Sequence, residues 1–214
     1  MCAAGAAVDH QAQNNGATPL LIACQKGHVE CVRLLCEAGA AVDRASDNGC
    51  TPLFMACHNG HVECVQLLSS YAASRTQLPP HVSSIEAVAE QFGRTELLAW
   101  LVHSRDWTPL HHTEILTAAR ARELLRAGAS LHAGSPSPLD LVHRSTSDAS
   151  ALLRRAAQWS MSSHELFPAS LRARALALLQ VGCQLAWSPR FEAESESLID
   201  AWRDYVLPNA LMRT

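Results

Sequence analysis

TPLLIACQKGHVECV at residues 18–32 recurs as TPLFMACHNGHVECV at residues 51–65, 33 positions further along the chain. Eleven of these 15 positions are identical in the two copies. A period of this length is typical of solenoid proteins, in which each repeat buries its apolar side chains only against neighbouring repeats. The repeat therefore predicts a binding scaffold and argues against an enzyme.

Each copy carries the signals of two short helices. Thr51-Pro52 marks a helix start, because threonine caps a helix and proline is tolerated in its first turn. Asn59-Gly60 ends that helix, since glycine adopts the left-handed conformation common at helix C-termini. Residues 61–68 then predict a second helix with apolar side chains at helical spacing. Residues 40–50 predict an extended loop with a turn at Asp47-Asn48-Gly49.

The pattern T-P-L-x-x-A-x-x-x-G-H-x-E, found at residues 18–30 and again at 51–63, resembles the ankyrin repeat. The resemblance implies an all-α solenoid of stacked antiparallel helix pairs, with β-hairpin-like loops along one edge. It also implies that His28 and His61 make hydrogen bonds within and between units. The function implied is that of a protein-binding scaffold.

The same register continues beyond the two clear copies. Residues 87–102 predict a third helix pair, preceded by a modified loop at 72–82 that contains two consecutive prolines. A fourth unit begins with WTPLH at 107–111, and a fifth with SPLDL at 137–141, whose second helix is predicted at 149–156. We therefore expect regular ankyrin repeats at 1–75, divergent repeats at 76–156 and a C-terminal helical cap at 157–214.

The first unit is truncated in this sequence. AGAAVD at residues 4–9 matches AGAAVD at 38–43, which is the tail of a unit, but no helix pair precedes the first copy. The first helix pair is therefore expected to expose an apolar side, whereas terminal units of solenoids usually carry a polar outer face. Either the sequence is a fragment of a longer array, or this end meets a partner.

The C-terminal residues leave the repeat period and predict two helices, at 169–185 and 192–207. The second has Leu198, Ile199, Trp202 and Val206 as its apolar side chains. Residues 70–214 resemble ankyrin proteins of unicellular algae, with a degenerate C-terminal half. Two interpretations of the tail stay open: it caps the solenoid, or it docks an adaptor, as in the ankyrin-type substrate receptors of ubiquitin ligases.

The spacing of the cysteines predicts a structural role. Cys24 and Cys57 are one period apart, as are Cys31 and Cys64, and free cysteine behaves as a small apolar residue. We therefore expect all four to be buried as thiols, together with Leu34 and Leu67. Cys57, His61 and Cys64 have a spacing that zinc could use, but a glycine between them should break the helix. We expect no metal and no cofactor.

Composition and motifs narrow the function further. The formal charge of −3 argues against a non-specific nucleic-acid binder, and no apolar run is long enough to cross a membrane. The sequence contains no phosphate-binding loop and no nucleophile motif. His111-His112 with Glu114 resembles a catalytic cluster, but the repeat pattern already accounts for His111. We expect a non-enzymatic, monomeric, cytoplasmic or nuclear protein whose partner is another protein.

The candidate binding surface consists of the loop tips and the exposed positions of the first helices, by the ankyrin resemblance. Phe92 is unusual there, because the preceding units carry Lys26 and Asn59 at the same position. It is expected either to anchor a partner or to pack under the loop with two prolines, and we favour packing. The predicted partner-binding residues are Asn14, Asn15, Ala17, Gln25, Lys26, Asp47, Asn48, Cys50, His58, Asn59, Gln91 and Phe92.

Overall fold

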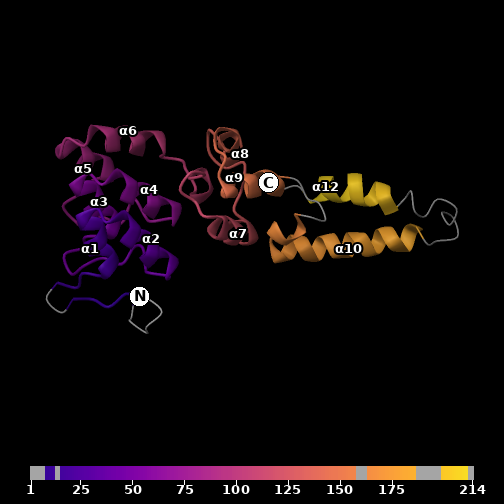
Figure 1. Ribbon diagram of the computed structural model, residues 1–214, viewed down its shortest axis with the longest axis horizontal. Coiled ribbons are helices and arrows are strands. Elements are labelled where there is room, and N and C mark those ends of the chain that lie inside the picture. The colour runs from indigo at the N-terminus through magenta and orange to yellow at the C-terminus, as the bar shows by residue number, and fades with distance from the viewer. Residues whose placement is uncertain (1–7, 13–14, 158–162, 187–198, 212–214) are drawn as a thin grey trace. The chain divides into compact units, whose positions relative to one another are not determined.

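The computed structural model describes residues 8–12, 15–157, 163–186 and 199–211. Every regular element among them is helical (Figure 1). The chain divides into two compact units, one ending at Ile115 and the other beginning at Leu116. This division falls inside the segment 76–156, and the three-part organisation expected from the sequence stays a prediction.

The first unit consists of three helix pairs stacked in register, as the 33-residue period predicts. The first helices of successive pairs contact one another, α1 with α3 and α3 with α5, and α2 likewise contacts α4 (Figure 1). The helices are α1 (Pro19–Lys26), α2 (Val29–Glu37), α3 (Pro52–Asn59), α4 (Val62–Ser70), α5 (Ile85–Gln91) and α6 (Thr95–His103).

Local signals explain where these helices begin and end. The Thr51 hydroxyl accepts a hydrogen bond from the Phe54 amide at 3.2 Å, which satisfies an amide that the first helical turn would leave unpaired. Ser84 caps α5 in the same way, although threonine and proline are missing there. Gly60 follows α3 with φ at +81°, a conformation that a side chain would strain.

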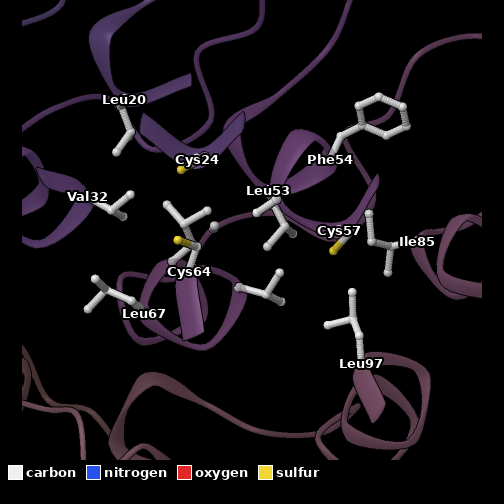
Figure 2. Packing of buried hydrophobic residues seen from close by; sticks show 14 of the residues in the cluster. Leu20, Cys24, Val32, Leu53, Phe54, Cys57, Cys64, Leu67, Ile85 and Leu97 are labelled. Atoms are coloured by element: carbon white, nitrogen blue, oxygen red, sulfur yellow. The ribbon is translucent and has the colours of Figure 1, made fainter. Parts of the chain in front are cut away.

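The core of the first unit lies between the stacked helix pairs. Leu53, Leu67 and Leu68 are almost completely buried there. Figure 2 shows the sulfur atoms of Cys24 and Cys64 among these apolar side chains. Burial raises the pKa of the Cys64 thiol to about 11, because the thiolate would lose its hydration. These cysteines act as packing residues.

Two of the side chains predicted to be buried are exposed. Leu34 is 52% accessible and Cys31 is exposed, whereas Leu67 and Cys64, one period later, are buried. The two positions lie three residues apart on α2, on the side that faces a preceding unit in the repeat register. The described residues hold no helix pair on that side, so the prediction of burial for Leu34 and Cys31 is wrong.

The loops between pairs are turns, and no strand is assigned to them in the described residues. In the first loop, the Ser46 amide donates to the Cys50 carbonyl at 2.9 Å, which closes the predicted turn. Successive loops are joined by carboxylates: Asp9 accepts from the Ala41 amide at 3.1 Å, and Asp43 accepts from Ser74 at 2.8 Å. The segment before the first helix pair thus makes the same contact as a repeat loop.

The fourth repeat, which begins at the end of the first compact unit, has a shortened first helix. Its first helix is only a 3-10 turn, Pro109–His111 (η2). His112 follows it and is 4% exposed, with Nε2 3.2 Å from the Ser69 hydroxyl. Burial, with the nearby Arg75 and His111, lowers the pKa of His112 to about 3. Trp100 is half-buried beside it, with the two ring centroids 5.9 Å apart.

The second unit begins with the remaining divergent repeats. It contains α7 (Ala118–Arg126), α8 (Pro138–Leu141), the 3-10 turn η3 (Val142–Arg144) and α9 (Asp148–Ala156), and α7 packs against α9. The Ser137 hydroxyl caps α8 by accepting from the Asp140 amide at 3.3 Å. The fifth unit therefore starts where its Ser-Pro-Leu pattern predicts.

The C-terminal helices pack against each other. After the turn η4 (His164–Leu166) come α10 (Ala169–Ala186), the π-helix η6 (Trp202–Val206) and α12 (Leu207–Ala210), and α10 contacts both η6 and α12 (Figure 1). Their shared core contains Phe167, Ala175, Leu207 and Leu211.

The apolar stripe predicted for the last helix differs in register. Leu207 is fully buried, whereas Val206 is 37% exposed. A π-turn widens the helix and rotates the residues that follow it, which places Leu207 rather than Val206 against α10. Leu198 and the predicted helix start lie outside the described residues.

Candidate functional site

One pocket lies on the side of the first unit that carries the first helices and the loops. Its volume is about 400 Å³. Residues of α3 and α5 form two walls, and the loop between α4 and α5 forms a third. The lining residues are Cys50, Phe54, Met55, His58, His81, Val82, Ser83, Ala87, Val88, Gln91 and Phe92.

The walls of this pocket are rich in rings and carry no carboxylate, lysine or arginine. The His58 ring lies between two phenylalanines, with centroids 6.1 Å from Phe54 and 4.2 Å from Phe92. Phe54 stands at the edge of the core cluster (Figure 2). An aromatic surface without carboxylates, lysine or arginine attracts apolar groups and offers no such partner to an incoming charge.

Phe92 behaves differently from the packing role that the sequence favoured. Its side chain remains 41% exposed, although one side of the ring is covered by His58. The loop residues His81, Val82 and Ser83 line the same pocket. The loop with two prolines therefore helps to form the pocket beside Phe92 and leaves much of the ring accessible.

Four of the predicted partner-binding residues line this one pocket: Cys50, His58, Gln91 and Phe92. Another four, Asn15, Lys26, Asp47 and Asn48, are exposed.

The other four are placed differently. Gln25 and Asn59 are half-buried, and the Asn59 side chain donates through Nδ2 to the Met55 carbonyl at 2.8 Å. Ala17 is 4% exposed, so its side chain is not accessible to a partner and we leave it out of the proposed surface. Asn14 lies outside the described residues.

Several lining residues could not be found from the repeat pattern. His81, Val82 and Ser83 belong to the irregular loop, whose path the period does not determine. Met55 and Ala87 lie at positions of the first helices that the repeat pattern does not assign to the binding surface. The replacement of a polar residue by Phe92 was the one sequence signal that pointed to this place.

His61 and His111, considered above as a metal ligand and a catalytic group, have structural contacts. His61 Nε2 lies 3.2 Å from the Gln25 carbonyl of the preceding unit, as the predicted inter-unit role requires. His111 Nδ1 accepts from the Thr108 amide at 2.8 Å, which completes a helix cap. His28 is exposed. Over the described ranges, no group of three or more histidine, cysteine or acidic side chains is placed to hold a metal ion.

Comparison with known proteins decides the family. Residues 1–77 match the family model described as ankyrin repeats in three copies. Residues 1–77 of this chain are ankyrin repeats. Ankyrin repeats indicate a protein–protein interaction module, in agreement with the stacked helix pairs of the first unit.

Solved structures of other proteins are also similar to this chain. The human ASB11 ankyrin repeat domain, known from its crystal structure, is 28% identical in sequence to this chain. The alignment covers 82% of this chain and 88% of the ASB11 chain, with a TM-score of 0.44. None of the curated proteins matches the sequence. No helix in the described part of the chain is long and apolar enough to cross a membrane.

Proposed function

We propose that this ankyrin-repeat protein is a non-catalytic scaffold that binds a protein partner through its loop tips and short first helices. The observation that carries the proposal is the pocket between α3, α5 and the loop before α5. A concave apolar site with a few polar groups is the usual form of a binding site. Here it lies among four residues that the repeat pattern had already assigned to the binding surface.

Exposed residues that the repeat pattern assigns to the binding surface extend it over all three helix pairs. Lys26 ends α1, Asp47 and Asn48 form the tip of the loop before α3, and Gln91 ends α5. Their side chains would form the polar rim that surrounds the apolar centre of protein interfaces. The central pocket and its rim together make a surface suited to one partner.

The adaptor interpretation receives no support from the tail. Leu207 and Leu211 of the tail are buried in one cluster with Phe167 and with Ala175 of α10, so neither side chain is free to dock an adaptor. Instead, Arg126 Nε of α7 donates to the Glu165 carbonyl at 3.1 Å, so the start of the tail attaches to the last repeats. We therefore retain the capping role for the tail.

We further propose a monomer that works in the cytoplasm or nucleus. Buried Cys24, Cys57 and Cys64 are used as thiols in the core. Such thiols persist in a reducing compartment.

A triple variant with one substitution in each of the first three repeats tests the surface. Lys26→Glu, Asp47→Arg and Gln91→Arg all change exposed side chains, so the fold should be retained. We expect the affinity for a partner isolated by pull-down, measured by calorimetry, to fall by about tenfold or more, equivalent to ~1.4 kcal/mol. The loss should appear because rim charges affect association with a matched surface.

The matched control changes the second helices instead. Cys31→Glu, Ala99→Arg and Val102→Lys are also exposed and add the same net charge as the first variant. We expect the control to bind within about twofold of the parent. Equal binding by both variants, or a loss only in the control, would place the partner on another surface.

A further inference from the structure

We propose that the pocket between α3 and α5 receives a single aromatic side chain from a loop or extended segment of the partner. This inference rests on the proposed function, since it identifies the chemistry of the group that the partner contributes. It adds a defined ligand class to a surface that the family resemblance describes only in general terms.

The size of the pocket limits its occupant. A volume of about 400 Å³ lies near the lower end of the roughly 300–1,000 Å³ found for ligand sites. One ring and the adjoining backbone suit such a space, whereas a whole helix does not. Two exposed lining residues, Ser83 and Gln91, are available to hydrogen-bond the backbone beside the ring.

The chemistry of the walls selects the side chain. Phe54, His58 and Phe92 offer ring faces and edges, and Met55 adds a thioether. Rings prefer tilted contacts with other rings, and methionine sulfur contacts rings favourably, so an aromatic group gains more here than an aliphatic group of similar area. A lysine or arginine would enter without a carboxylate among the lining residues and would lose hydration without compensation.

The partly covered ring of Phe92 supports the same choice. His58 covers one side of it at 4.2 Å between centroids, yet 41% of the side chain is accessible. Aromatic residues, including phenylalanine, are enriched at protein interfaces, and here the accessible ring stands beside a pocket. An incoming ring can contact Phe92 on its free side while it fills the pocket.

The test is a set of NMR titrations of the isotope-labelled full chain with three amino-acid amides. N-acetyl-L-tryptophanamide should shift the amide signals of Phe54, His58, Val82 and Phe92, with a dissociation constant on the order of millimolar. N-acetyl-L-leucinamide should bind at least about threefold more weakly, and N-acetyl-L-lysinamide about tenfold more weakly. Equal binding of the leucine and tryptophan amides, tighter binding of the lysine amide, or shifts elsewhere would overturn the inference.

Two variants separate the pocket from the rest of the surface. Ala87→Phe places a ring in the pocket and should abolish the shifts, whereas Ala99→Phe on α6 is the matched control and should leave them unchanged. Phe92→Ala should reduce the preference for tryptophan over leucine to about one, a ratio that a general loss of structure would not produce. Full binding by Ala87→Phe, or an unchanged preference in Phe92→Ala, would contradict the assignment.

These outcomes are distinct from those of the proposed function. A partner that binds both triple variants equally contradicts the use of this face, whatever the pocket prefers. A pocket without a preference for rings overturns the inference and leaves the use of the face by the partner intact.

Discussion

Leu67→Ala is expected to lower the free energy of unfolding by about 2–5 kcal/mol, because it removes a fully buried side chain between stacked repeats. Leu34→Ala, one repeat period earlier, should cost only about 0.5 kcal/mol, since Leu34 is 52% exposed. The pair is a matched comparison, because the residue type and the position within the repeat are the same.

Denaturant unfolding followed by circular dichroism measures both values. Equal losses in the two variants would show that Leu34 is covered in solution. A loss below about 0.5 kcal/mol at Leu67 would mean that the assigned register of the second helices is wrong.

The first unit should lose stability in mild acid because of His112. Its folded-state pKa of about 3 lies below the ordinary histidine value of 6.5, so the folded state resists protonation that the unfolded state accepts. The contribution of His112 to the free energy of unfolding is therefore constant above pH 6.5. It falls by about 1.4 kcal/mol per pH unit down to about pH 3, or by ~5 kcal/mol at most.

His112→Gln removes this titration while keeping a polar group that can reach Ser69. Unfolding free energies of parent and variant, measured from pH 8 to pH 4, should differ by a constant amount above pH 6.5. Below it, the parent should lose stability faster than the variant. Parallel curves across the whole range would show that the His112 ring is accessible to protons in the folded protein.

Local chemistry made much of the fold predictable. The Thr51 cap and the positive φ of Gly60 each depend on a few adjacent residues, so two copies of the pattern predict two pairs of helices. The same reasoning found the later units, because Ser84 and Ser137 replace threonine as caps without changing the hydrogen bond.

The errors occurred where burial depends on a distant neighbour. Cys31 and Leu34 repeat the sequence of Cys64 and Leu67, but a repeat position is buried only when another helix pair covers it. In the tail, the π-turn at Trp202–Val206 changes which residue faces α10, and helical periodicity alone does not predict such a turn. Sequence patterns describe local conformation better than they describe what lies opposite.

The candidate site was predictable only in part for the same reason. The positions of Cys50, His58 and Gln91 follow from the repeat, so their surface could be named in advance. The third wall comes from 81–83, in an irregular loop whose path depends on contacts made after folding. Because of that wall, the exposed Phe92 lines a pocket.

Amide hydrogen exchange of the chain, alone and saturated with its partner, tests the central claim most directly. The claim predicts that binding slows exchange at residues 47–50, 55–59 and 81–92, which form the loop tip and the walls of the pocket. Slowed exchange confined to the second helices α2, α4 and α6, or to residues 199–211 of the tail, would contradict it.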